Sequence, residues 1–195
     1  VQQIIREQFD DMADYKIREI PEKLHDPMKF NFRSVLFVCD DRKGRVKGFA
    51  LFSAEPALQF GFLDLIALSN ATKGSGVGAA LYERVQEECV SLGFNWLFFE
   101  CLTDLEQHNP DQEQLKNNKA RLRFYERMGA RPVTGTLYER PRRANAGNAY
   151  FLMADDLDSG NRLEREVARK VVTAVLRRKY KKTMSDKLIK EVVAS

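Results

Sequence analysis

The sequence has few of the residues that build disulfide frameworks, zinc sites or membrane spans. It holds three cysteines, two histidines and one tryptophan in 195 residues, and no C-x-x-C pair occurs. Neither a disulfide framework nor a zinc site is indicated, and we expect no bound metal. No segment approaches the roughly 20 apolar residues of a membrane helix, and VQQIIREQFDDM at the start lacks a signal peptide's apolar core. We therefore expect a cytoplasmic protein that does not span a membrane.

The charge is only modestly unbalanced. The formal net charge is +4, with 31% charged and 44% hydrophobic residues, which is typical of a globular protein. Much of the positive charge lies in RRKYKK at 177–182. We interpret this run as a solvated helix face, and a nucleic-acid patch is the disfavoured alternative because no base-reading residues accompany it.

The first half of the chain alternates helical and strand-like patterns. Apolar spacing predicts a helix over 1–12 and a short one over 15–20, ended by Pro21. Two strand-like runs around Asp-Arg-Lys-Gly predict an antiparallel hairpin within SVLFVCDDRKGRVKGFALFSAE, and a third strand covers 60–69. The sequence therefore predicts an antiparallel meander of three strands.

The second half predicts an α/β unit followed by helices. A helix begins near Val77 and ends before Gly93, and the apolar run FNWLFFECL predicts a buried strand that completes a parallel crossover. Later elements are expected at 113–128 (helix), 131–139 and 148–154 (strands), and beyond 158 as charged helices, the last begun by Ser185. The expected bounds are 1–158 for an α/β domain and 159–195 for a helical extension or connector.

The run TKGSGVGAALYERV at 72–85 places three glycines in five positions directly before a helix. It matches neither the Walker A spacing nor the dinucleotide fingerprint in its context. Glycines let an anion approach the backbone, and a helix start offers unpaired N–H groups and about half a positive charge. A pyrophosphate is the expected ligand, and a glycine turn that only allows tight packing is the alternative.

Two motifs resemble those of the GNAT N-acetyltransferases. Lys73-Gly-Ser-Gly-Val-Gly78 is similar to the [RQ]-x-x-G-x-[GA] coenzyme-A loop, and the preceding Leu63-Asp-Leu-Ile-Ala-Leu68 is similar to the family's fourth strand. Asn118-Lys-Ala-Arg-Leu-Arg-Phe-Tyr-Glu-Arg-Met-Gly-Ala is similar to the N-x-x-A-x-x-[FL]-Y-x-x-x-G-[FA] helix. The resemblance covers about 30–157. It implies a mixed α/β, mostly antiparallel central sheet flanked by helices, with a C-terminal helical extension.

The sequence departs from the family pattern in three places. Lys73 replaces the usual Arg or Gln, and Arg121 stands where a small residue is common. The family's first strand is not evident ahead of the N-terminal helix, and residue 1 is Val rather than Met. We therefore expect a chain trimmed at its front.

The resemblance implies direct transfer of an acetyl group from acetyl-CoA to a primary amine. A non-catalytic acetyl-CoA sensor that regulates an attached or associated deacetylase is the alternative, because binding needs only the glycine loop and Asn118. The pantetheine arm is implied to lie beside 66–68, where a backbone N–H near Leu68 polarises the thioester. The implied acetyl-CoA contacts are Ile66, Ala67, Leu68, Lys73, Gly74, Ser75, Gly76, Val77, Gly78, Ala79, Asn118, Arg121, Phe124 and Tyr125.

Three residues are candidates for catalysis. The resemblance implies Tyr125 as the general acid for the departing thiolate, and Asn118 lies two helical turns earlier, roughly 10 Å along the same face. Asp64 and Glu100 are acids inside otherwise apolar strands, so burial would raise the pKa of either toward that of a base. The alternative for each is a satisfied structural carboxylate.

The acceptor and the partners stay open. Small molecules and protein lysines both qualify: acidic residues at 104–113 would attract a polyamine or a lysine, whereas Arg140, Arg142 and Arg143 would attract an anionic amine. The tail ARKVVTAVLRRKY, with FRSVLFVCDD and FFECLTD, resembles the acetyltransferase module of bacterial proteins that carry a histone-deacetylase-like domain. This implies a fused or associated deacetylase. The oligomeric state is open between monomer and dimer.

Overall fold

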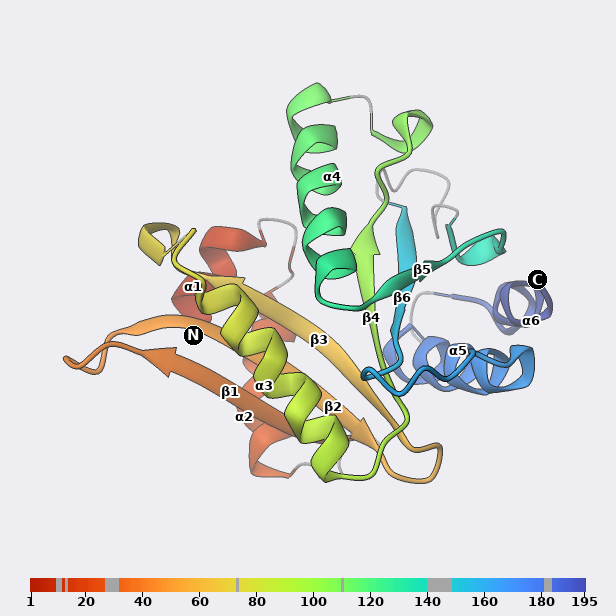
Figure 1. The fold of residues 1–195 in the computed structure, drawn as a ribbon, viewed down its shortest axis with the longest axis horizontal. Helices are drawn as coiled ribbons and strands as arrows, with labels where there is room; N and C mark the ends of the chain where they lie inside the picture. The colour runs from red at the N-terminus through yellow and green to blue at the C-terminus, as the bar shows by residue number, and fades with distance from the viewer. Residues whose placement is uncertain are drawn as a thin grey trace. The chain divides into compact units, whose positions relative to one another are not determined.

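The structure is a computed structural model that describes residues 1–9, 12, 14–26, 32–72, 74–109, 111–139, 149–180 and 184–195. The chain forms two compact units, Val1–Leu97 and Phe98–Ser195. Figure 1 labels the elements, which in chain order are α1 (Gln2–Gln8), α2 (Asp14–His25), β1 (Arg33–Asp40), β2 (Val46–Glu55), β3 (Phe60–Leu68), α3 (Val77–Ser91), β4 (Trp96–Leu102), α4 (Gln112–Arg127), β5 (Arg131–Val133), β6 (Tyr150–Asp155), α5 (Arg165–Lys179) and α6 (Asp186–Ala194).

The first unit contains the predicted antiparallel meander. Strand β2 pairs with β1 on one side and β3 on the other, both antiparallel. Between β2 and β3 the register shifts, since Leu51 faces Leu65 but Phe52 faces Leu63. Asp64 is therefore the extra residue of a β-bulge, which bends the strand and re-aims its side chain.

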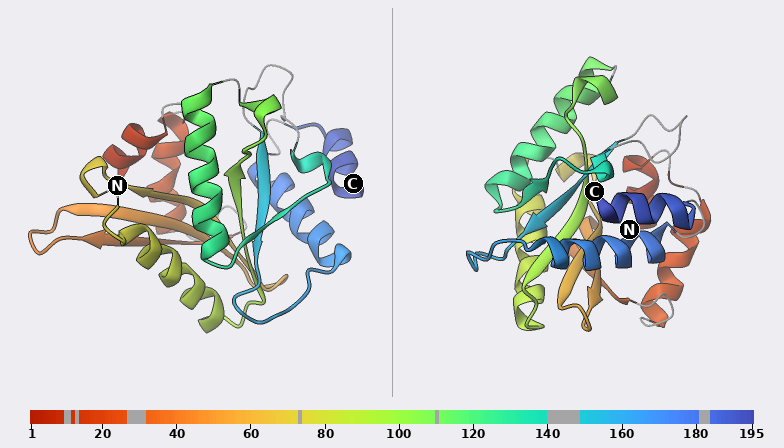
Figure 2. Two further views of the ribbon diagram at one scale, coloured as in Figure 1. Left: turned by 45° about the horizontal axis from the view of Figure 1, so that its top comes forward. Right: turned by 90° about the vertical axis from the view of Figure 1, so that its right-hand side faces the viewer.

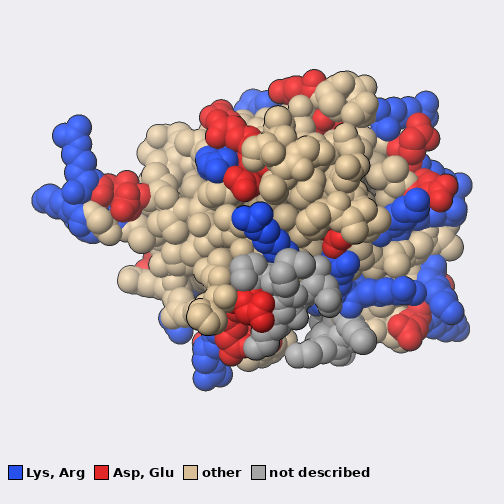
Figure 3. Space-filling view, turned by 90° about the horizontal axis from the view of Figure 1, so that it is seen from below, with Lys and Arg blue, Asp and Glu red and all other residues tan. Residues whose placement is uncertain are grey.

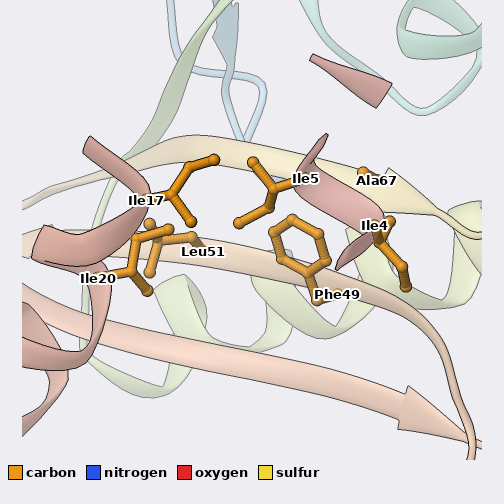
Figure 4. Packing of buried hydrophobic residues seen from close by; sticks show 7 residues of the cluster. All are labelled: Ile4, Ile5, Ile17, Ile20, Phe49, Leu51 and Ala67. Carbon is orange, nitrogen blue, oxygen red and sulfur yellow. The ribbon is translucent and has the colours of Figure 1, made fainter. Parts of the chain in front are cut away.

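Helices cover both faces of this meander. Helix α3 crosses one face, and α1 and α2 lie on the other (Figure 1). Alternating residues of β2 serve the two sides: a side chain at Gly48 would meet Leu81 of α3, whereas Phe49 and Leu51 point toward α1 and α2. Figure 4 shows the cluster on the α1 and α2 side, which consists of Ile4, Ile5, Ile17, Ile20, Phe49, Leu51 and Ala67.

The N-terminal helices differ from the sequence prediction. Helix α1 ends at Gln8 rather than at residue 12, and α2 continues to His25 with Pro21 inside it. Proline in a helix interior costs about 3 kcal/mol. Burial of Ile17 and Ile20 contributes about 1.5–3 kcal/mol each and offsets this cost, because both side chains are almost fully buried. The expectation that Pro21 ends the helix was therefore wrong.

A charged turn joins β1 to β2. The carboxylate of Asp41 accepts hydrogen bonds from the backbone N–H groups of Arg45 and Lys43 and from the Arg45 guanidinium. The Arg45 N–H is the largest cause that holds the pKa of Asp41 below its usual range. Figure 3 shows side chains of both charge signs at the projecting end where this turn lies.

The second unit holds β4 from Phe98 onward, β6 and β5 in this spatial order, with β5 and β6 antiparallel. Strand β5 has only three residues, so the prediction of a strand to 139 was too long; Leu137–Glu139 forms a 3-10 turn instead. The predicted loop at 141–148 and Arg140 lie outside the described residues. Helix α4 begins where predicted, since Asp111 caps it by accepting from the N–H groups of Glu113 and Gln114.

The predicted C-terminal helical extension is also present. Helices α5 and α6 lie side by side (Figure 2), and Ser185 caps α6 as expected. Helix α5 buries Val171, Val175 and Leu176. The mixed α/β fold with a mostly antiparallel sheet and flanking helices is therefore confirmed. Within the described part of the chain, no helix combines the length and the apolar character needed to cross a membrane.

Candidate active site

The glycine loop lies between β3 and α3. Gly74 and Gly76 have φ angles of +81° and +83°, and no atom lies within 4 Å of where a Cβ would stand on either. Any other L-residue would therefore be strained there by its backbone conformation. Its Cβ would not clash with neighbouring atoms. Thr72 holds the loop from behind, because its carbonyl accepts from the backbone N–H of Ser75 at 3.2 Å and from the Ser75 hydroxyl at 2.6 Å.

The start of α3 is open to an anion. Gly76 is its N-cap and supplies no side-chain hydrogen bond. The first N–H groups of a helix have no acceptor within that helix, so those of Val77, Gly78 and Ala79 are available to a ligand. Gly74, Ser75 and Gly76 are exposed. The structure thus places the predicted cradle from 74 to 79 in one loop and one helix turn, while Lys73 lies outside the described residues.

The predicted pantetheine segment is the end of β3. Ile66, Ala67 and Leu68 pair with Ala50, Phe49 and Gly48 of β2, and the backbone N–H of Ser69 donates to the carbonyl of Lys47. The segment is therefore held in register directly before the glycine loop. Its contact with pantetheine stays a prediction.

Asp64 is half-buried in the bulge of β3. Its carboxylate accepts a hydrogen bond from the hydroxyl of Ser53, a buried residue of β2. The bulge and this bond fix the direction of the side chain. No sequence signal marked Ser53, because a serine in a strand is an ordinary residue.

Asn118 is buried on α4 and tied to the loop after β4. Its Nδ2 donates to the Thr103 carbonyl at 3.1 Å and to Asn109 Oδ1 at 2.7 Å. Asn109 in turn donates to the carbonyls of Thr103 and Leu105, both at 2.8 Å. Since both amide hydrogens of Asn118 are engaged, only its Oδ1 could accept from a pantetheine amide.

Tyr125 lies on the same buried face of α4. Its ring centroid is 4.4 Å from that of Phe99 and 5.1 Å from that of Phe124. Burial is the main cause that raises the pKa of the Tyr125 hydroxyl well above its ordinary value; proximity to Cys101 adds to the rise and exposed Arg121 opposes it. Burial likewise raises the pKa of the Cys101 thiol to about 11. Tyr125 therefore holds its proton throughout the neutral range, as a general acid must.

Glu100 lies in β4 beside Phe99, so its side chain points to the opposite face of the strand from Tyr125. Its Oε1 accepts from the Tyr138 hydroxyl at 2.7 Å. Its Oε2 accepts from the Tyr180 hydroxyl at 2.5 Å and lies 3.1 Å from Lys179 Nζ. The carboxylate is only 8% exposed. Sequence reasoning missed these three partners.

The candidate residues therefore fall into sets within each unit. The first unit brings together the glycine loop, the end of β3 and Asp64. The second places Asn118, Arg121, Phe124 and Tyr125 on α4, and Glu100 on the other face of β4. Among the described residues, no group of three or more His, Cys, Asp or Glu side chains could hold a metal ion.

Residues 2–130 match the family model described as the acetyltransferase (GNAT) family. The chain belongs to the GNAT family. It is an N-acetyltransferase of a family that uses acetyl-CoA and acts on amines. The resemblance to the GNAT N-acetyltransferases is confirmed.

Solved structures show the same fold. An aminoglycoside 6'-N-acetyltransferase complexed with coenzyme A is 18% identical, covering 84% of this chain and 91% of that one, with a TM-score of 0.58. Ard1 from Thermoplasma volcanium is 19% identical over 79% and 86%, with a TM-score of 0.53. The ribosomal-protein-S18-alanine N-acetyltransferase from Escherichia coli is 21% identical over 68% and 75%, with a TM-score of 0.50.

No curated protein matches the sequence significantly. At 18–21% identity, these solved structures show only that the fold is shared. The fused or associated deacetylase, the cytoplasmic location, the oligomeric state and the domain bounds at 158 and 159 stay predictions.

Proposed function

We propose that the protein transfers an acetyl group from acetyl-CoA to a primary amine by direct attack, without a covalent enzyme intermediate. The observation that carries the proposal is the exposed loop from Gly74 to Gly76, which enters α3 with two left-handed glycines and leaves the helix start without a side-chain cap. Backbone N–H groups at a helix start favour a pyrophosphate, which coenzyme A carries.

Gly78 supports this assignment by its size. A Cβ there would meet only Leu68, at 3.6 Å, an ordinary contact. Neither backbone conformation nor packing therefore requires glycine at this position. A ligand that lies against the first turn of α3 would require it, because a side chain would occupy the ligand's place.

Tyr125 acts as the general acid in this proposal. The attacking nitrogen forms a bond to the thioester carbon, the carbon–sulfur bond breaks, and the phenol protonates the departing thiolate. Because its pKa is raised, the phenol stays protonated until the thiolate leaves. Such proton transfer contributes typically about 10²–10⁴-fold to the rate.

Glu100 is the proposed base. A base must lie within about 2.6–3.2 Å of the proton it takes, or reach it through one water. Glu100 Oε2 already lies 3.1 Å from an ammonium nitrogen, that of Lys179. Asp64, the second candidate, accepts from the buried Ser53 hydroxyl, and we assign it a positioning role.

Calorimetry with acetyl-CoA, followed by turnover on a panel of amines and lysine peptides, tests the proposal. We expect micromolar binding and transfer to at least one acceptor. Tyr125→Phe should keep the binding and lower kcat about 100-fold, within the range for a general acid. Tyr15→Phe, the same change at an exposed position of α2, is the matched control and should retain kcat.

Two outcomes would contradict the proposal in different ways. Binding without turnover on any acceptor would favour the non-catalytic acetyl-CoA sensor. Absence of binding would exclude both functions, because each requires the glycine loop to hold coenzyme A.

A further inference from the structure

The carboxylate of Glu100 holds a primary ammonium of this same chain. Lys179 is the last residue of α5, and its Nζ lies 3.1 Å from Glu100 Oε2. The same nitrogen lies 5.9 Å from the ring centroid of Tyr180, within the reach of a cation–π contact. An unbranched alkylammonium is thus paired with the proposed base and lies near an aromatic ring.

The surroundings of Glu100 are arranged for such a cation. A carboxylate has about four acceptor positions, and the hydroxyls of Tyr138 and Tyr180 each fill one. Both hydroxyls fix the orientation of the carboxylate, and neither carries a charge. A carboxylate that is 8% exposed is costly without a cation nearby. The Lys179 ammonium supplies a positive charge.

The stem of Lys179 runs from the surface to this carboxylate. The lysine side chain is 30% exposed, whereas the carboxylate is almost covered. Four methylene groups therefore lie between the backbone of α5 and the carboxylate. Removing the stem would vacate the space that it fills beside the carboxylate.

We propose that Glu100, Tyr138 and Tyr180 form the ammonium subsite of the acceptor, and that Lys179 occupies it as a tethered competitor. The subsite accepts unbranched primary alkylammonium groups, such as a protein lysine or the end of a polyamine. Of the acceptor classes left open by the sequence, it disfavours anionic amines, because a second carboxylate-bearing group would approach a buried negative charge. The inference rests on the proposed function through the role of Glu100 as base.

A truncated lysine tests the subsite by binding alone. Lys179→Ala keeps Cβ and removes a three-carbon chain with its ammonium, so n-propylammonium replaces what is lost. We expect calorimetry in the presence of coenzyme A to give saturable n-propylammonium binding to Lys179→Ala, at least tenfold tighter than to the wild type. Lys179→Met fills the space of the stem without charge and should bind no tighter than the wild type. n-Propanol, the uncharged probe, should not bind to Lys179→Ala.

Two further variants complete the design. Lys170→Ala, on the exposed surface of α5 where Lys170 pairs with Glu166, should behave as the wild type. Adding Glu100→Gln to Lys179→Ala should abolish n-propylammonium binding. If Lys179→Ala fails to fold, Lys179→Ser carries the same test. Equal n-propylammonium binding by Lys179→Ala and the wild type would overturn the inference.

The proposed function and the subsite can fail separately. Binding of n-propylammonium to Lys179→Ala without acetyl transfer to any amine would leave the subsite and refute the transferase. Acetyl transfer by the wild type with no gain of n-propylammonium binding in Lys179→Ala would refute the subsite and leave the transferase.

Discussion

The candidate site residues of the two units differ in kind: backbone N–H groups in the first unit and side chains in the second. In the first unit the anion cradle consists of backbone N–H groups, and its geometry depends on Gly74 and Gly76 in the left-handed region. In the second unit the reactive groups are side chains, and Glu100 takes its environment from residues 38 and 80 positions along the chain. A backbone site depends on local sequence, whereas a side-chain site depends on the fold.

Glu100→Gln against Asp64→Asn is the sharpest test of this difference, because each unit contributes one candidate base. We expect Glu100→Gln to lower kcat by about 100-fold or more, as removal of a general base does. Asp64→Asn should retain kcat within about threefold, because its amide oxygen still accepts from Ser53, in line with a positioning role rather than proton transfer. Steady-state kinetics at saturating acetyl-CoA measures both.

Thermal unfolding of each variant controls for lost structure. Glu100→Gln leaves Lys179 beside a neutral amide, so some loss of stability is expected, but a folded variant must still bind acetyl-CoA. A larger loss of kcat in Asp64→Asn than in Glu100→Gln would show that Asp64, and not Glu100, is the general base.

Asn118 tests whether the second unit depends on long-range hydrogen bonds. Asn118→Ala removes the donor to Thr103 and Asn109. The Thr103 carbonyl still accepts from Asn109, but buried Asn109 Oδ1 loses its Asn118 donor, which costs about 1–3 kcal/mol. We expect the free energy of unfolding to fall by about 2 kcal/mol in urea denaturation. Asn117→Ala, at the exposed neighbouring position, should change it by less than about 0.5 kcal/mol. Equal losses in the two variants would mean that the network around Asn118 stabilises nothing.

Gly76 tests the backbone site of the first unit. Gly76 and Gly93 flank α3 at opposite ends, with φ angles of +83° and +70° and no atom near either Cβ position. Alanine at each should cost a similar strain of about 1–2 kcal/mol. Only Gly76→Ala should weaken acetyl-CoA binding, by about tenfold, because the strain reorients the N–H groups of Gly76 and Val77. If Gly93→Ala weakened acetyl-CoA binding by the same factor, the loss in Gly76→Ala would not show that the N–H groups at the start of α3 bind the ligand.

The same contrast explains what the sequence could and could not predict. The glycine loop, α3 and the face of α4 that carries Asn118 and Tyr125 follow from spacings within about 15 residues, so they were predicted correctly. The bulge at Asp64 was missed because a one-residue register shift leaves no local pattern.

The partners of Glu100 were missed for a related reason. Tyr138 and Tyr180 meet it through the fold. Arg177, Arg178 and Lys179 are exposed, in line with the predicted solvated face, but no local pattern pairs Lys179 with Glu100. For Pro21 the local signal was present but gave a wrong helix end. Its helix-breaking preference was outweighed by the burial of Ile17 and Ile20.

The pH dependence of Tyr125 should show the smallest effect. A free phenol has a pKa of about 10, and burial raises the pKa of Tyr125 further. The protonated acid is therefore the only significant form at every pH below that value. The ratio of the wild-type kcat to that of Tyr125→Phe should stay constant from about pH 7 to about pH 10, although both rates rise as the acceptor amine loses its proton. A ratio that falls to about half at about pH 10 would mean that Tyr125 titrates like a free phenol in water, so that burial does not raise its pKa in the working enzyme.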